Sequence, residues 1–135
     1  MIQCFNPKLD YFKQDVFDSL SFSQVATVGD QFHFSGIAPL KGGLSDLQLM
    51  GTTHEEQLSF ILDTARACFE ECGLAVENLI SWTIYVTDIE GFANVANQYL
   101  QKFLGTHRPA CTLVQVAKMI HPEQLIEIAM IAKKP

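Results

Sequence analysis

Hydrophobic and polar residues recur along the chain with two different periods, and the change from one period to the other predicts the secondary structure. Residues 79–87 alternate strictly, and one face of this stretch is formed by Ile80, Trp82, Ile84 and Val86. The opposite face carries Ser, Thr and Tyr side chains, so the stretch predicts a strand with one apolar and one polar face. The polar face is a candidate for contact with another subunit.

Four more short strands are predicted, over residues 25–28, 31–35, 111–116 and 125–132. The first two flank the turn dipeptide Gly29-Asp30 and predict a hairpin. A proline-led entry opens the strand at 111–116, and a tight connection joins it to the last strand. The final strand is almost wholly apolar and contains a single carboxylate, Glu127.

Two helices are predicted from apolar positions at a period near 3.6 residues. Thr53 followed by Glu56 forms a capping box, and Gly73 predicts where this helix ends. Its apolar positions are Leu58, Ile61, Leu62, Ala65, Phe69 and Cys72. Asp88 is positioned to cap a second helix, whose buried stripe is Phe92, Val95, Ala96, Tyr99 and Phe103.

The elements follow the order β-β-α-β-α-β-β, which predicts an α/β (α+β) fold with one mixed sheet and two helices on one face. The uncovered face of such a sheet needs a partner, and an oligomer that packs sheet faces together would supply it. Residues 39–51 contain Gly42-Gly43 and little periodicity, so a mobile loop is expected. We interpret residues 1–135 as a single domain. Its amino-terminal extension, 1–19, is rich in aromatic residues and is therefore expected to pack against the folded protein.

Composition narrows the functional classes. Hydrophobic residues make up 48% of the 135 residues and charged residues only 18%, so apolar surface is expected to remain on the folded monomer and to favour self-association. The formal net charge of −6 argues against a general nucleic-acid binder. A membrane span needs about 18 consecutive apolar residues, and no stretch of the chain approaches this length. No secretory leader is recognised either, so a cytoplasmic protein without membrane contact is expected.

The cysteines and histidines predict neither a disulfide nor a metal site. Cys4, Cys68, Cys72 and Cys111 contain no CxxC pair, which favours free thiols in a reducing compartment. Cys68 and Cys72 lie one helical turn apart and are interpreted as small buried thiols rather than a redox pair. The four histidines lack metal-ligand spacing, so no metal is expected.

Glu127 is the strongest single candidate for chemistry. A carboxylate inside an apolar strand is costly to bury unless a partner or a proton satisfies it. Such a group suits general acid or base catalysis. The alternative is a structural carboxylate that accepts backbone hydrogen bonds at a subunit junction.

A series of short motifs, in order from about Ser21 to Ala132, resembles the reactive intermediate deaminases, also called the Rid, YjgF or endoribonuclease L-PSP family. The motifs are Phe34-Ser35-Gly36, the helix starting near Gln57, Gly73, Thr87-Asp88, Phe92 with Tyr99, Pro109-Ala110, and Ile126-Glu127-Ile128 followed by Ala132. The resemblance implies a chorismate-mutase-like fold, a homotrimer with a central sheet barrel, and ligand clefts between subunits.

The resemblance also implies a reaction. In active members an arginine after the Pro-Ala pair clamps the carboxylate of an enamine or imine derived from an amino acid, and a glutamate helps to position the attacking water. No metal or organic cofactor is needed, because the imine is already reactive. The expected partners are therefore a small-molecule metabolite and further copies of the chain.

The site residues of the family are only partly retained. Glu127 matches the glutamate and Ser35 the serine of the strand motif, although strand serines often only bond to the backbone. Other positions depart: Cys111 stands at the arginine, Phe22 at an aromatic that is commonly tyrosine, Ala96 at an asparagine and Leu113 at a cysteine. The usual 2-imino-acid specificity is therefore in doubt.

Two alternatives exist for Cys111, a nucleophilic or redox-sensitive thiol or a small semi-buried residue without chemistry, and the second is favoured. A replacement for the arginine clamp would have to come from Arg66, Arg108 or a lysine such as Lys118. A lysine supplies a point charge and cannot reproduce the guanidinium fork. Ser35, Phe22, Thr112 and Arg108 are the predicted substrate contacts, with Glu127 and Cys111 as the catalytic candidates.

Three functions follow as alternatives. The first is a cofactor-free hydrolase or deaminase of an enamine, imine or related electrophile, and Glu127 favours it. The second is a catalytically silent trimer that binds a metabolite or a protein partner, which Cys111 and Ala96 favour. The third is the ribonuclease or translation-inhibitor activity attached to the family name, which the acidic composition disfavours.

Overall fold

The computed structural model describes all residues 1–135 and contains one six-stranded mixed sheet. Its strands are β1 (Ile2–Phe5), β2 (Val25–Val28), β3 (Gln31–Ile37), β6 (Leu79–Val86), β7 (Ala110–Gln115) and β8 (Ile126–Lys133). Their order across the sheet is β1-β2-β3-β8-β6-β7. Only β6 and β7 are parallel, and every other neighbouring pair is antiparallel.

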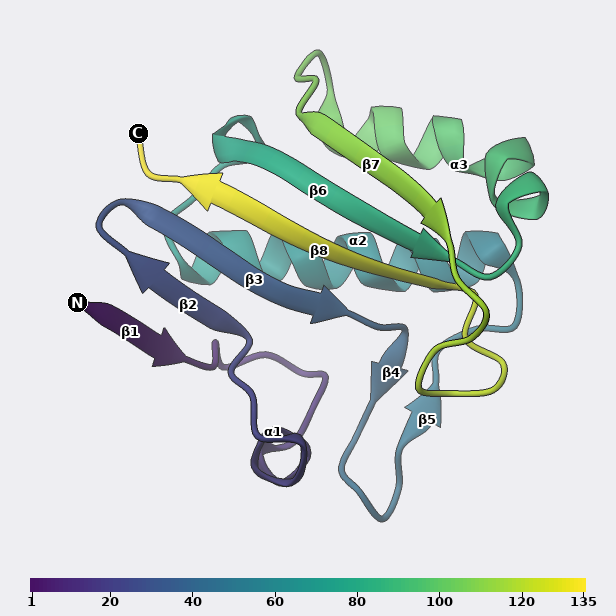
Figure 1. Ribbon diagram of the computed structural model, residues 1–135, viewed down its shortest axis with the longest axis horizontal. Helices are drawn as coiled ribbons and strands as arrows, with labels where there is room; N and C mark the ends of the chain where they lie inside the picture. The colour runs from purple at the N-terminus through teal and green to yellow at the C-terminus, as the bar shows by residue number, and fades with distance from the viewer.

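Two long helices cover one face of the sheet, as predicted. Figure 1 shows α2 (His54–Glu71) and α3 (Ile89–Leu104) side by side behind the strands. The remaining elements are α1 (Gln14–Leu20), a two-stranded sheet of β4 (Leu40–Lys41) and β5 (Gln48–Leu49), and a short 3₁₀ helix (Val76–Asn78). Helix α1 and the β4–β5 pair lie below the β3 side of the sheet in Figure 1. None of the helices combines the length and the apolar character that a bilayer crossing requires.

The helix boundaries follow from the signals in the sequence. Thr53 and Glu56 form the predicted reciprocal capping box at the start of α2. Gly73 follows the helix with φ +70°, a left-handed conformation that glycine adopts at little cost. Asp88 caps α3 by accepting a hydrogen bond from the backbone N–H of Gly91 (3.1 Å). The predicted order of β-β-α-β-α-β-β is confirmed by β2, β3, α2, β6, α3, β7 and β8.

Three expectations are corrected. Residues 39–51 contain the β4–β5 pair rather than an unstructured loop, because Leu40 pairs with Leu49 and Lys41 with Gln48. The connection between the strands predicted at 111–116 and 125–132 is not tight, because residues 116–125 lead past β6, which lies between β7 and β8. Ile80 does not join the apolar face of β6: a register shift between Leu79 and Ser81 leaves Ile80 exposed and buries Leu79.

The core lies between the sheet and the two long helices. The Phe34 and Phe69 rings stack with centroids 5.1 Å apart, and the Trp82 and Phe103 rings with centroids 5.9 Å apart. The guanidinium of Arg66 lies over the Phe103 ring at 4.8 Å. Arg66 therefore packs on the helix layer and does not reach the open face of the sheet.

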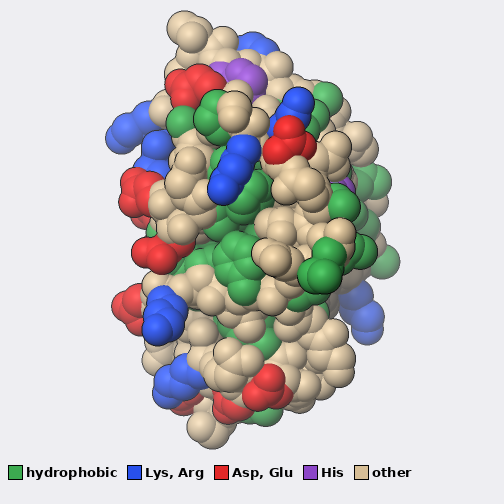
Figure 2. Space-filling model, turned by 90° about the vertical axis from the view of Figure 1, so that its left-hand side faces the viewer, with side chains coloured by type: hydrophobic (Ala, Val, Ile, Leu, Met, Phe, Trp, Pro, Cys, Tyr) green, Lys and Arg blue, Asp and Glu red, His purple; other side chains and the backbone are tan.

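Considerable apolar surface stays exposed on the single chain. The exposed large side chains include Leu113 and Val114 on the edge strand β7, Ile120 after it, and Ile2 and Val28 on β1 and β2. On the end of the molecule seen in Figure 2, hydrophobic side chains gather in the middle and charged ones lie around them. Apolar surface of this kind is typical of proteins that associate.

The amino-terminal segment docks on its own chain. Strand β1 extends the sheet by pairing with β2, and Tyr11 and Phe17 are buried. The amide of Gln24, itself fully buried, accepts a hydrogen bond from the Tyr11 hydroxyl (2.7 Å) and donates one to the Ser35 carbonyl (2.8 Å). Burial raises the pKa of Tyr11 well above its usual range, so its hydroxyl stays protonated and acts as the donor. Gln24 thus ties the segment to β3.

We expect Gln24→Leu to lower the free energy of unfolding by roughly 2–3 kcal/mol, because the Tyr11 hydroxyl and the Ser35 carbonyl lose their buried partner. Urea denaturation followed by circular dichroism measures this change. Gln98→Leu, on the exposed side of α3, is the matched control and should change stability by less than about 0.5 kcal/mol. Equal effects of the two substitutions would contradict the role of Gln24.

Candidate functional site

A cavity of about 670 Å³ lies on the face of the sheet that α2 and α3 leave uncovered. Its floor is formed by Ser35 and Gly36 of β3, Glu127 and Ala129 of β8, and Tyr85 of β6. Side chains of the amino-terminal segment, the β4–β5 region and the connection after β7 form its walls. A cavity of this size is typical of small-molecule sites.

Glu127 reaches this cavity because of its position in β8. Its neighbours Ile126 and Ile128 point into the core and are fully buried, so the alternation of the strand directs Glu127 to the open face, where it is half-buried. Tyr85 of β6 is its direct cross-strand partner. The carboxylate lies against the backbone of Gly36, where a Cβ would come within 2.8 Å of the Glu127 Cδ and overlap Oε2. The absence of a side chain at Gly36 therefore leaves the space that the Glu127 carboxylate occupies.

A buried amide holds the other carboxylate oxygen. The Nε2 of Gln124 donates to Oε1 of Glu127 (3.2 Å) and also to the carbonyl of Ile126 (3.1 Å). Gln124 is only 2% exposed, and a third contact joins its Nε2 to the sulfur of Met119 (3.3 Å). Because the neighbours of Nε2 are acceptors, Nε2 and not Oε1 faces Glu127, and Gln124 thereby positions the carboxylate. The buried Oε1 of Gln124 has no hydrogen-bond partner.

Another buried glutamine fixes the connection that precedes β8. Gln57 of α2 accepts a hydrogen bond from the N–H of Leu125 (2.7 Å) and donates to the carbonyls of Glu123 (3.0 Å) and Gly51 (3.2 Å). Both the start of α2 and the loop before Glu127 are thereby attached to one side chain. This loop is the segment that also carries Gln124.

Two further predicted residues line the same cavity as Glu127. Ser35 contributes to the floor and Phe22 to the wall. The Ser35 hydroxyl donates to the carbonyl of Ser23 (2.7 Å), so its proton serves the backbone and only its oxygen lone pairs remain for a ligand. The ring of Phe22 lies 4.9 Å from that of Phe17, centroid to centroid, and is supported by this buried residue.

Lys118 and Tyr85 also line the cavity and were not among the predicted contacts. The sequence offers Lys118 only as an inferior substitute for the arginine clamp. It lies in the connection after β7, and it and Glu127 are the only charged residues in the cavity lining. Tyr85 could have been found from its place on the polar face of β6. The cavity therefore offers one cation, one carboxylate and one phenol to a ligand.

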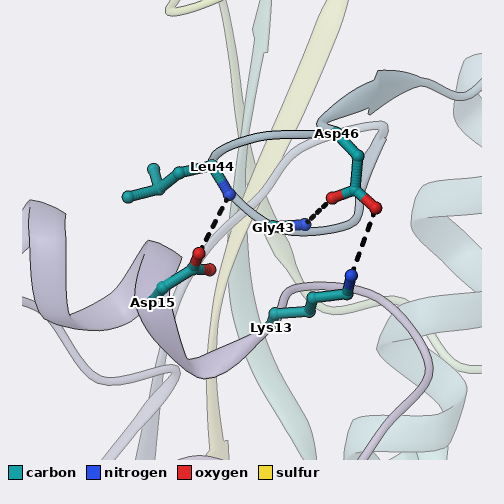
Figure 3. Close-up of polar contacts among 5 residues, drawn as sticks. All are labelled: Lys13, Asp15, Gly43, Leu44 and Asp46. Carbon is teal, nitrogen blue, oxygen red and sulfur yellow. Dashed lines mark hydrogen bonds and ion pairs between the residues drawn. The ribbon is translucent and has the colours of Figure 1, made fainter.

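The outer wall of the cavity is held by polar contacts between the start of α1 and the β4–β5 turn (Figure 3). Lys13 pairs with Asp46 (3.1 Å), and Asp15 accepts a hydrogen bond from the N–H of Leu44 (3.3 Å). Asp46 also accepts a hydrogen bond from the N–H of Gly43 (2.8 Å). This hydrogen bond lowers the pKa of Asp46 below its ordinary value, and the contact with Lys13 lowers it further. These contacts attach the two wall segments to one another.

The remaining predicted residues lie elsewhere in the chain. Cys111 pairs in parallel register with Trp82, a core residue, so it points to the helix-covered side of the sheet, opposite to Glu127. Thr112 lies on exposed strand β7, and Arg108 donates to the backbone carbonyls of Gly105 (2.7 Å) and His107 (2.8 Å). None of these three lines the cavity, and the two catalytic candidates do not meet within one chain.

Comparison with known proteins identifies the relatives. The family model described as endoribonuclease L-PSP matches residues 15–134, which is nearly the whole chain. The chain belongs to the endoribonuclease L-PSP family.

Three relatives illustrate the similarity. The RutC family protein SSO3206 of Saccharolobus solfataricus is 28% identical over 84% of this chain and 86% of its own. The crystal structure of Escherichia coli TdcF with bound serine is 25% identical, with a TM-score of 0.72 over 84% of this chain and 88% of that one. Rv2704 of Mycobacterium tuberculosis, of the YjgF/YER057c/UK114 family, is 19% identical, with a TM-score of 0.79 over 99% and 100% of the two chains.

These comparisons confirm that this L-PSP family chain is a Rid/YjgF relative and has the fold expected from its motifs. The likeness to Rv2704 includes the first residues of the chain, so the docked amino-terminal segment is part of the shared architecture. That Cys111 stands where active members of the family have an arginine stays a prediction from the sequence motifs.

Three thiols of this L-PSP family chain, those of Cys68, Cys72 and Cys111, are poorly suited to nucleophilic attack. Burial raises the pKa of Cys68 to about 12 and that of Cys72 to about 11. Partial burial also raises the pKa of Cys111 above its ordinary value, and a hydrogen bond from Trp82 only partly opposes this. Because its pKa is raised, Cys111 is mostly the neutral thiol at neutral pH, whereas the reactive form is the thiolate.

We expect iodoacetamide near neutral pH to alkylate Cys111 no faster than a free model thiol, because the raised pKa leaves little thiolate. Peptide mass spectrometry over time measures the rate, and Cys111→Ser identifies the labelled peptide. A rate well above that of the model thiol would contradict the inert interpretation of Cys111.

Proposed function

We propose that this L-PSP family protein is a cofactor-free hydrolase that releases ammonia from an enamine or imine derived from a 2-amino acid. The observation that carries the proposal is the placement of Glu127, a carboxylate held by Gln124 and Gly36 at the floor of a cavity. A base fixed in this way is a recurrent requirement of general acid–base catalysis.

The proposed chemistry is addition of water followed by loss of ammonia. Glu127 accepts a proton from water while the water oxygen bonds to the imine carbon. The C=N electron pair moves to nitrogen, which takes that proton from Glu127 and forms a carbinolamine. The hydroxyl proton of the carbinolamine then passes through Glu127 to the amino nitrogen, and the C–N bond breaks to release ammonia and leave a 2-oxo acid. An enamine enters the same route after proton transfer to its carbon. No metal or organic cofactor takes part in this sequence.

The charges in the cavity suit an amino-acid-derived ligand. Such a ligand carries a carboxylate, and Lys118 is the only cationic side chain in the cavity lining. We propose that Lys118 pairs with the carboxylate while Glu127 faces the imine carbon and the water. The structure of TdcF with bound serine supports an amino-acid-like ligand, because that relative is 25% identical to this chain.

The second candidate is a trimer that binds a metabolite without turnover. Cys111 favours it, because in active members an arginine stands at this position, and a lysine lacks the guanidinium fork. Ribonuclease activity is disfavoured, since a net charge of −6 and a single cation in the cavity offer little attraction to a phosphate backbone.

We expect Glu127→Gln to reduce the rate of ammonia release at least about a hundredfold, because the amide cannot accept the proton of water. The assay generates imines in situ with an amino-acid oxidase and measures ammonia with and without the protein. Glu123→Gln, on the exposed loop before β8, is the control and should keep full activity. Activity retained in Glu127→Gln would refute the assignment of the base.

We also propose a homotrimer in which neighbouring copies cover the exposed edge strand β7 and the open face of the sheet. The exposed Leu113 and Val114 on β7 and the apolar Ile120 beside it support this association. Light scattering should give three times the 15.1 kDa of one chain. A stable monomer at micromolar concentration would contradict the proposal.

A further inference from the structure

We propose that the edge strand β1 pairs antiparallel with β1 of a second copy of the chain, so that the sheets of the two copies continue into one another. This contact is separate from the proposed trimer contacts, which use β7 and the open face of the sheet. It rests on the position of β1, on its unblocked outer edge and on its fit to a second copy of itself.

Strand β1 lies at one end of the six-stranded sheet and has a single neighbour, β2. Its residues Ile2–Phe5 pair with Val25–Val28 in an uninterrupted register, and all four of them are exposed. In Figure 1 the strand forms the outer margin of the sheet. A strand in this position presents unpaired backbone N–H and C=O groups, which can pair with a further strand.

Nothing along β1 blocks this pairing. Charged side chains, prolines and bulges commonly protect an edge strand. Residues 1–6 contain no charged side chain and no proline, and no bulge interrupts the register between β1 and β2. Pro7 and Lys8 follow directly after these residues. The edge is therefore open to another strand along β1 and closed beyond it.

Apolar side chains are exposed on both faces of this edge. Ile2 is 68% exposed and lies beside its cross-strand partner Val28, which is 45% exposed. Phe5 is 40% exposed, points to the other face by the alternation of the strand, and lines a groove together with Phe32 and Cys72. An added strand would cover part of both faces, so apolar burial would supplement its backbone hydrogen bonds.

The occupant that matches this edge is β1 itself. Two copies related by a two-fold axis perpendicular to the sheet run antiparallel, and opposing side chains point to the same face. With Cys4 opposite Cys4 of the second copy, residues 2–6 of the two chains pair, and Pro7 of each lies just beyond the paired segment. No charged side chain enters this contact, although the chain has a net charge of −6. A longer strand from another protein would run into Pro7 and Lys8.

Sedimentation equilibrium over a range of concentrations tests this pairing. Because the interface is small, we expect it to be populated only above about 50 μM, where the mean mass should rise beyond that of the basic assembly. Cys4→Lys places two like charges opposite each other and should raise the dissociation constant of this step by about fivefold. Cys4→Ser, which keeps an uncharged side chain at the same exposed position, is the matched control and should associate like the natural protein.

Equal mass curves for the natural protein and Cys4→Lys would overturn the inference and leave a strand of another protein as the occupant of this edge. The proposed trimer is judged separately, because it does not use β1. Its mass of three chains should persist in Cys4→Lys at low concentration.

Cross-linking locates the contact. In a Cys111→Ser background, Cys4 carries the only thiol on an exposed residue. A short bis-maleimide, added at a concentration where the chains associate, should join two chains through Cys4, and peptide mass spectrometry should find the segment 1–8 linked to itself. No such product, or Cys4 linked only to another segment, would overturn the inference.

Discussion

Three buried glutamines hold the parts of this molecule that surround its cavity. A buried amide is costly unless its polar atoms find partners, so the hydrogen bonds of these side chains fix the segments that they contact. Gln24 and Gln57 use both their oxygen and their nitrogen, and Gln124 uses its nitrogen alone. Gln24 joins the amino-terminal segment to β3, Gln57 joins the start of α2 to the loop before β8, and Gln124 holds the carboxylate of Glu127. The long helices and the sheet form the core independently of these amides, whereas the cavity depends on all three.

The regular part of the fold was predictable because its signals are local. A capping box, a left-handed glycine and an apolar stripe at helical spacing set α2, and strict alternation set most of β6. The missed elements have weaker signals. Strands β4 and β5 have two residues each, β1 is exposed along its length and is held by its pairing with β2, and α1 is supported by aromatic residues around Phe17 that follow no clear period. The position of β7 beside β6 is likewise a tertiary property that no local pattern encodes.

Site residues could be predicted only where a reactive side chain interrupts the apolar pattern of a strand or belongs to a family motif. Glu127 stands out as a lone carboxylate in an apolar strand, and the family motifs add Ser35 and Phe22, which line the same cavity. Gln124 and Lys118 give no such signal, because single polar residues in loops are common and only the folded chain shows their neighbours. The position of Cys111 within the family motif suggested a shared site, but the pleat of β7 directs its side chain to the opposite face from Glu127.

The central claim is that the carboxylate of Glu127 works because Gln124 orients it. The most direct test is the steady-state kinetics of ammonia release by Gln124→Leu, measured beside the unfolding curve of the variant. We expect a kcat lower by about ten- to a hundredfold with KM nearly unchanged, since a misplaced base affects the chemical step more than binding. An unchanged kcat in a folded variant would contradict it.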